Sequence, residues 1–154
     1  MSLLELKVPP PIVALVLALL MWMTTSSTAG LLQLRHPVSV LFAVVLVCVG
    51  MSISFAGVFA FRRAKTTVSP TKASSASSLV VQGVYRYTRN PMYVGFLLTL
   101  LAWAVFLENP LAALWALVFV LYITRFQIIP EERVLASLFG EEYEAYKGSV
   151  RRWL

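Results

Sequence analysis

The sequence contains no aspartate, one cysteine (Cys48) and one histidine (His36). A single cysteine cannot form an internal disulfide, and inside an apolar run it is expected to act as a small buried hydrophobic residue. His36 has no cysteine or aspartate near it, so we expect neither a zinc site nor a Ser-His-Asp triad, and we interpret it as a loop or interface residue. No glycine-rich phosphate loop occurs. These absences argue against metal chemistry and most nucleophilic catalysis.

Charged residues are also scarce. They make up 13% of the 154 residues, whereas 59% are hydrophobic. A soluble domain of this length carries about a quarter charged residues. The composition therefore predicts an integral membrane protein, and the length suits a single domain over 1–154. Topology and anionic headgroups account for the net charge of +6, so nucleic acid is not an expected partner.

The hydrophobic residues fall in four runs, which predict an all-α protein with about four transmembrane helices. The runs are residues 11–23, 38–61, 91–107 and 110–129. The first run would also suit a signal-peptide core, but only Lys7 precedes it as a cation and Glu5 offsets it. We therefore expect a retained membrane helix that extends through residues 24–28, whose hydroxyls can bond back to helix carbonyls.

Two local patterns predict how the helices meet. Gly50, Ser54 and Gly57 form a small-residue stripe on the second run, which permits close helix packing or a helix-mediated dimer. Only Glu108 and Asn109 separate the last two runs, so these runs are expected to form a tight antiparallel hairpin.

The basic residues predict the orientation. Most of them follow the second run (Arg62, Arg63, Lys65, Lys72, Arg86 and Arg89) or the fourth run (Arg133, Lys147, Arg151 and Arg152), whereas the loop between the first two runs carries only Arg35. The positive-inside rule places both groups in the cytoplasm, and four spans then place both termini there as well.

The chain divides into a transmembrane pair (1–62), a polar cytoplasmic connector (63–82) and a second half (83–154). Within the connector, residues 65–78 are expected to be a linker or a gate. A helical amphipathic tail is predicted from Pro130, punctuated by Gly140, with Tyr143 and Tyr146 at the membrane surface.

The remaining polar side chains in the second half are arginine, glutamate, tyrosine and asparagine. Such a set can bind a zwitterion and align two reactants, which suits methyl transfer from S-adenosylmethionine. Arginine suits the cofactor carboxylate, and glutamate suits its ammonium or ribose hydroxyls. Taken alone, Arg86, Arg89 and the neighbouring tyrosines favour a membrane anchor with an aromatic belt over a site. Taken alone, Glu131 and Glu132 likewise favour a solvated first helical turn.

Three segments together resemble the isoprenylcysteine carboxyl methyltransferase family and the related membrane phospholipid N-methyltransferases. They are GVYRYTRNPMYVG at 83–95, PEERVL at 130–135 and FGEEYEAY at 139–146. The similarity covers about half of the chain, from residue 81 to the C-terminus. It implies a helical membrane methyltransferase with a cytoplasmic cofactor site.

Carried over by position, the resemblance implies which residues form that site. The cofactor pocket would draw on Tyr85, Arg89, Asn90, Tyr93, Glu131 and Glu132, and the basic end of the family matches Arg151 or Arg152. Arg89, Asn90 and Glu132 are the expected catalytic residues. Arg125 is a further cofactor-binding candidate, and it could also snorkel or pair with Glu131 or Glu132. Asn90 stands where the family often has histidine, and asparagine cannot act as a base near neutral pH.

The predicted function is transfer of a methyl group from S-adenosylmethionine to a lipophilic acceptor that enters from the bilayer. A carboxylate acceptor is favoured because it is already ionised near neutral pH. The alternatives are a phospholipid N-methyltransferase, an NADPH-dependent membrane reductase and a non-enzymatic membrane subunit.

Overall fold

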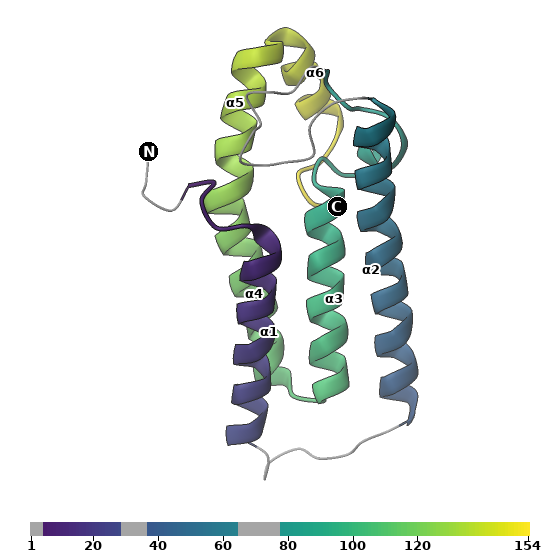
Figure 1. Ribbon diagram of the computed structural model, residues 1–154, viewed down its shortest axis with the longest axis vertical. Helices are drawn as coiled ribbons and strands as arrows, with labels where there is room; N and C mark the ends of the chain where they lie inside the picture. The colour runs from purple at the N-terminus through teal and green to yellow at the C-terminus, as the bar shows by residue number, and fades with distance from the viewer. Residues whose placement is uncertain (1–4, 29–36, 65–77) are drawn as a thin grey trace.

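The computed structural model describes residues 5–28, 37–64 and 78–154, and within them it is helical with no strand (Figure 1). The elements are α1 (Pro10–Ser27), α2 (Pro37–Arg63), the short 3₁₀ helix η2 (Gly83–Arg86), α3 (Pro91–Leu107), α4 (Pro110–Ile123), the π-helix η3 (Thr124–Ile128), α5 (Ile129–Phe139) and α6 (Glu141–Ser149). His36 and all of the predicted 65–78 linker except Ser78 lie outside the described residues.

Three helices are long and apolar enough to cross a membrane. They are α1 with 18 residues, α2 with 27, and a continuous rod of 30 residues formed by α4, η3 and α5. The shorter α3, with 17 residues, lies between α1 and α2 in the same bundle (Figure 1). The all-helical membrane architecture is thus confirmed, and the count of four spans stays a prediction.

The rod corrects the predicted end of the fourth run near residue 129. The chain continues as one helix through η3 into α5, and Pro130 lies in the first turn of α5. Proline is tolerated there because the π-turn before it already departs from the regular hydrogen-bond ladder. The helix stops at Gly140, whose φ of 51° a residue with a side chain rarely adopts.

Hydroxyl groups hold the end of α1. Thr24, Thr25, Ser26 and Ser27 each donate to the carbonyl four residues earlier, so the polar stretch stays helical as predicted. The hydroxyl of Thr24 also accepts from the indole nitrogen of Trp115 in α4 at 3.0 Å. This bond ties α1 to the rod.

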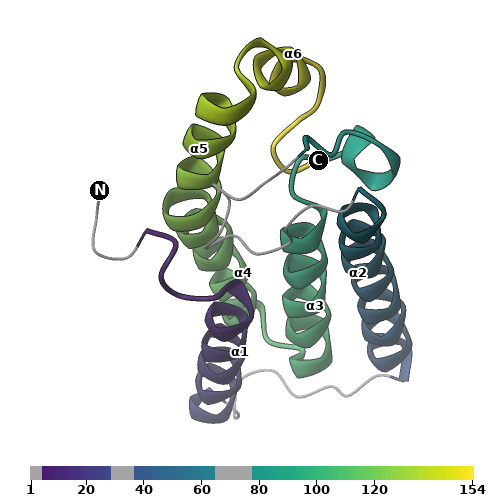
Figure 2. The same ribbon diagram turned by 45° about the horizontal axis from the view of Figure 1, so that its top comes forward.

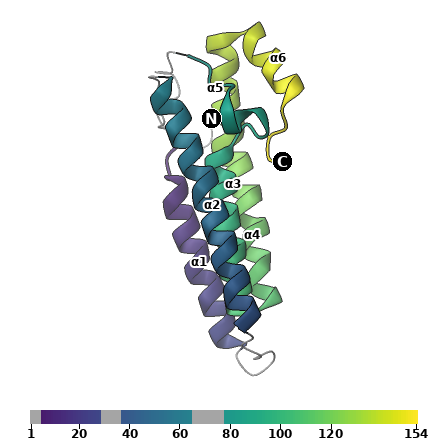
Figure 3. The ribbon, with the colours of Figure 1, turned by 90° about the vertical axis from the view of Figure 1, so that its right-hand side faces the viewer.

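The small-residue stripe of α2 is used within the chain. A Cβ atom on Gly95 of α3 would collide with the Ser54 hydroxyl and would lie 2.5 Å from the Gly50 carbonyl oxygen. Gly57 likewise faces Pro91 and Met92. Because α3 covers the stripe, it does not offer a surface for a dimer. In Figure 3, α2 runs alongside α3 over most of its length.

The hairpin between α3 and α4 turns within two residues, as predicted. Glu108 adopts a left-handed conformation (φ 50°), and the Asn109 side chain accepts from the backbone of Leu111 at 2.9 Å. Its amide nitrogen donates to Thr28 at 2.7 Å, which joins the turn to α1.

The elements that carry the candidate site gather at the opposite end of the bundle. In Figure 2, η2, the start of α3, the end of the rod and α6 lie at this end, and the segment after α6 runs back toward α3. The three segments that resemble the methyltransferases, at 83–95, 130–135 and 139–146, therefore lie at the same end of the bundle.

Candidate functional site

Glu132 is the centre of a three-residue ionic cluster. Its carboxylate lies 3.2 Å from Nη2 of Arg89 and accepts two hydrogen bonds from Arg152, at 2.9 Å from Nε and 2.8 Å from Nη2. Two parallel bonds from one guanidinium are a strong, oriented arrangement. The side-chain pKa of Arg152 is raised by these bonds to Glu132. The cluster joins α5, the segment before α3 and the C-terminal segment.

Arg89 keeps unused hydrogen-bond donors in this cluster. Its side chain is only 9% exposed, yet Nε and Nη1 have no hydrogen-bond partner among the described residues. Buried donors without partners are costly, so they indicate a place for a ligand acceptor. A carboxylate or a hydroxyl group has the chemistry to fill it.

Glu131 has a different partner from its neighbour. It accepts a hydrogen bond of 2.5 Å from the hydroxyl of Tyr93 in α3. No arginine pairs with Glu131 in the described part of the chain, whereas Glu132 has two. The two consecutive glutamates are thus chemically distinct.

The C-terminal segment holds the start of α3 in place. The backbone nitrogen of Arg89 donates to the Arg151 carbonyl at 3.0 Å, and the Asn90 amide nitrogen donates to the Arg152 carbonyl at 2.9 Å. Further along, the indole nitrogen of Trp153 donates to Thr124 of η3 at 3.1 Å. Asn90 therefore contributes a backbone anchor that positions Arg89.

Aromatic residues enclose the cluster. Tyr85 is buried against Phe61, with ring centroids 5.3 Å apart, and its carbonyl accepts from the Tyr146 hydroxyl at 2.8 Å. Burial raises the pKa of Tyr85 and of Tyr146. Burial also raises the pKa of Tyr143 to about 12, with Glu132 adding to the rise and Arg89 opposing it. These phenols are neutral donors at physiological pH.

The expected membrane-surface position of Tyr143 and Tyr146 was wrong. The two side chains are 2% and 9% exposed, because α6 folds back over the cluster. Their spacing of three residues places both on one helix face, a signal that could have indicated a buried face.

The expected pairing of Arg125 with Glu131 or Glu132 was also wrong. Arg125 lies 3.1 Å from Glu5, which Arg133 also contacts at 3.4 Å. The nearby backbone bond from Leu6 to the Phe126 carbonyl, at 3.0 Å, fastens the N-terminal segment to η3. Nothing in the local sequence of Arg125 indicates a partner 120 residues away.

Cys48 is exposed on α2, which corrects its expected burial. Among the residues that the structure describes, no group of three histidine, cysteine or acidic side chains could hold a metal ion.

Comparison with known proteins identifies the family. A family model described as phospholipid methyltransferase matches residues 38–142. This match covers more than half of the chain, and the chain belongs to this family. It is thus a membrane protein of a methyltransferase family.

Individual relatives agree with this assignment. Protein-S-isoprenylcysteine O-methyltransferase A of Arabidopsis thaliana is 35% identical over 112 residues, which are 71% of this chain and 55% of that protein. The corresponding enzyme of Schizosaccharomyces pombe is 30% identical over 106 residues, 67% of this chain and 44% of that protein. An uncharacterized protein of Haemophilus influenzae is 54% identical over 63 residues, 41% of this chain and 100% of that protein.

The chain spans about half the length of these isoprenylcysteine methyltransferases. No solved structure matches it.

Proposed function

We propose that the protein transfers a methyl group from S-adenosylmethionine to a lipophilic acceptor at the cytoplasmic face of the membrane. The observation that carries this proposal is Arg89, a buried guanidinium with two nitrogen donors that have no hydrogen-bond partner among the residues that the structure describes. A chain of a methyltransferase family needs a methyl donor, and S-adenosylmethionine carries a carboxylate that such donors would satisfy.

The residues present fit the cofactor. Arg89 would bind the carboxylate, since Glu132 already orients its guanidinium from the other side. Glu131 and Tyr93 would take the ammonium or the ribose hydroxyls, and Tyr85 would supply an aromatic wall. Asn90 would act through its bond to the C-terminal segment. Arg125 forms an ion pair with Glu5, so we do not include it among the residues that bind the cofactor.

The cofactor supplies an already activated methyl group, so the protein has to align the acceptor and exclude water. The buried tyrosines and the segment that closes over α3 serve this purpose. No residue needs to act as a nucleophile.

A carboxylate remains the favoured acceptor. It is ionised near neutral pH, and the curated relatives are named as isoprenylcysteine O-methyltransferases. The second candidate is the amine of a phospholipid headgroup, since the matching family model is described as phospholipid methyltransferase. An amine must lose a proton, and Glu131 is a carboxylate with no cationic partner in the described residues, suited to accept it.

The charge distribution supports a cytoplasmic site. Arg62 and Arg63 end α2, and Arg86 and Arg152 lie close to the site end of the bundle, while the opposite turn between α3 and α4 holds Glu108 and Asn109. By the positive-inside rule, the site and both termini face the cytoplasm.

Calorimetric titration of the purified protein with S-adenosylhomocysteine tests this proposal, with NADPH as the control ligand. Saturable binding of the homocysteine product alone is the expected result. Binding of NADPH alone would instead support a reductase. Binding of neither by a folded protein would contradict any cofactor role for Arg89.

A further inference from the structure

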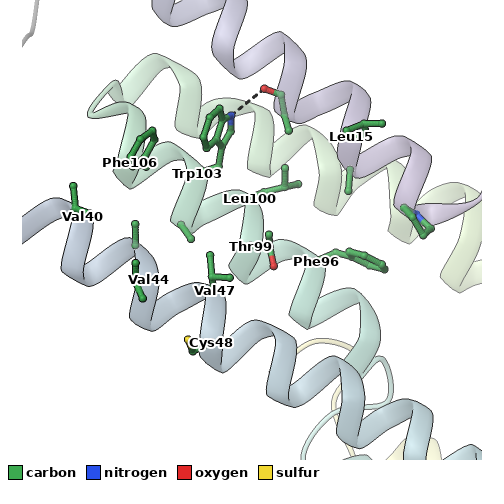
Figure 4. Close-up of a pocket in the computed structure, with 15 residues that line it drawn as sticks. Leu15, Val40, Val44, Val47, Cys48, Phe96, Thr99, Leu100, Trp103 and Phe106 are labelled. Atoms are coloured by element: carbon green, nitrogen blue, oxygen red, sulfur yellow. Dashed lines mark hydrogen bonds between the residues drawn. The ribbon is translucent and has the colours of Figure 1, made fainter.

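Two pockets in the described part of the chain have similar volumes and different chemistry. The first, of about 560 Å³, lies between α1, α2 and α3 (Figure 4). The Thr99 hydroxyl in its lining donates to the Gly95 carbonyl at 2.9 Å. The Trp103 indole donates to the Ala18 carbonyl at 3.0 Å, as the dashed line in Figure 4 marks. Because these groups are already paired, neither is free to recognise a polar ligand.

The second pocket lies at the end of the bundle that carries η2, and it has a volume of about 550 Å³. Its first wall is the last part of α2, from Ala56 to Ala64, and its second wall is formed by residues 79–84. Pockets of about 300–1,000 Å³ are typical of small-ligand sites. The second pocket is therefore large enough to take a ligand between α2 and the segment that leads into η2.

Much of both walls of this second pocket is apolar. The side chain of Phe59 on α2 is 67% exposed. The facing segment contributes Leu79, Val80 and Val81, each of which is partly buried. Covering apolar surface of this kind with hydrocarbon is favourable, whereas leaving it in contact with water is not. The walls therefore favour a ligand with a hydrocarbon part.

The pocket also carries one cation. Arg63 lines it and lies four residues after Phe59, on the same face of α2. Its side chain is exposed, and it forms no ion pair with any acidic side chain in the described part of the chain. All seven acidic residues of the protein are described, and none of them lines the pocket. The charge of the lining thus complements an anion.

The order of these groups along α2 matches that of a phospholipid. Arg62 and Arg63 form the basic last turn of the helix, at the end of its apolar span. Phe59 lies about 6 Å deeper along the helix axis than Arg63. In a phospholipid, the phosphate likewise lies at the membrane surface and the acyl chains lie below it. Basic residues next to a membrane helix attract anionic headgroups.

We propose that this pocket binds an anionic phospholipid, with the phosphate at Arg63 and the first part of an acyl chain against Phe59 and Val80. The side-chain amide of Gln82, which also lines the pocket, has donors for the headgroup. An anionic lipid is favoured over a zwitterionic one, whose ammonium Arg63 would repel.

This lipid is a bound partner and is distinct from the methyl acceptor. None of the residues to which we assign cofactor binding lines the pocket. The inference therefore goes beyond the proposed function and does not depend on it.

Photo-crosslinking in vesicles tests the inference. The probe is a phosphatidylglycerol with a diazirine on its acyl chain, close to the glycerol, as a minor component of phosphatidylcholine vesicles. Mass spectrometry maps the labelled residues. The test variant is Arg63→Gln. Arg62→Gln is the matched control, since Arg62 is the preceding residue of α2, is also exposed and does not line the pocket.

Labelling of residues 56–60 and 79–84 is expected in the unchanged protein. Arg63→Gln should reduce it at least about fivefold, equivalent to about 1 kcal/mol, and Arg62→Gln should leave it unchanged. Excess unlabelled phosphatidylglycerol should compete. Glycerol phosphate in the buffer should not compete, because it lacks the acyl chain. Thermal unfolding checks that both variants are folded.

Three results would overturn the inference. Equal loss of labelling in the two folded variants would indicate diffuse attraction of anionic headgroups to the end of α2. Equal labelling by a phosphatidylcholine probe of the same design would indicate an ordinary bilayer contact. Competition by glycerol phosphate would indicate a site for a free phosphate instead of a lipid.

Discussion

Arg152 binds Glu132 through two hydrogen bonds of 2.9 and 2.8 Å, although 20 residues and the whole of α6 separate them in sequence. This contact closes the C-terminal segment over the start of α3. The same segment supplies the carbonyls that accept from Arg89 and Asn90. The geometry of the candidate site therefore depends on the last few residues of the chain.

Replacing Arg152 with alanine should loosen this closure. Among the described residues, Glu132 would lose its two-bond partner and keep Arg89 as its one ion-pair partner. We expect a loss of about 1–3 kcal/mol in stability, since Arg152 is partly exposed. The affinity for S-adenosylhomocysteine should fall with it. Thermal unfolding and calorimetry measure the two effects. Arg151→Ala is the control, because only the backbone of Arg151 bonds to the site; an equal effect of both variants would contradict a specific role for the Arg152 side chain.

Tyr93→Phe should remove the hydrogen bond to Glu131 while keeping the ring. A partly buried carboxylate that loses its donor is destabilised by about 1–3 kcal/mol, which should appear as a lower unfolding temperature and slower methyl transfer. Tyr87→Phe is the matched control, since Tyr87 is 77% exposed. Full activity in Tyr93→Phe would exclude this pair from the reaction.

Gly95→Ala tests the close contact between α2 and α3. The added methyl group would meet Ser54 and the backbone of Gly50, and overpacking of this kind costs about 1–3 kcal/mol. We expect a clear drop in thermal stability. Gly148→Ala in α6 has open space around its Cβ position and should be neutral or slightly stabilising. A neutral Gly95→Ala would show that the two helices are less tightly packed than described.

Arg125→Gln should weaken the attachment of the N-terminal segment and leave cofactor affinity unchanged. Arg125 pairs with Glu5, which retains Arg133 as a partner. Hydrogen exchange of residues 5–8 would report the weakened attachment, and titration with S-adenosylhomocysteine would report the affinity. A tenfold loss of affinity for S-adenosylhomocysteine would contradict this prediction and would indicate that Arg125 binds the cofactor.

Local sequence patterns were enough to predict the helical membrane architecture. The apolar runs and the two-residue turn at Glu108 and Asn109 are local features of the sequence. The structure has apolar helices in these runs and a two-residue turn between α3 and α4. The sequence predicted a boundary near Pro130, between the fourth apolar run and the tail helix. The structure has one continuous helix there, because a π-turn before Pro130 accommodates the proline. The stripe of Gly50, Ser54 and Gly57 was compatible with packing inside the chain and with a helix-mediated dimer. The tertiary structure shows that α3 packs against it.

The candidate site could be predicted only as a set of residues. Motif resemblance brought Arg89, Tyr93, Glu131 and Glu132 together, but it could not show that the two glutamates have different partners. Arg152 and Glu5 act across large sequence separations. Such contacts depend on how α6 and the N-terminal segment fold back. The spacing of Tyr143 and Tyr146 indicates a buried face on α6, but it does not indicate which residues that face covers.

The central claim is that Arg89 binds the carboxylate of the methyl donor. Its most direct test is calorimetric titration of Arg89→Gln with S-adenosylhomocysteine. Arg86→Gln serves as the control, because Arg86 is exposed in the same segment. Arg152 still compensates Glu132 in the variant, so the fold should persist and can be checked by thermal unfolding. We predict that Arg89→Gln loses at least about tenfold in affinity, or about 1.4 kcal/mol, while Arg86→Gln binds like the unchanged protein. Equal affinity of the two folded variants would contradict the claim.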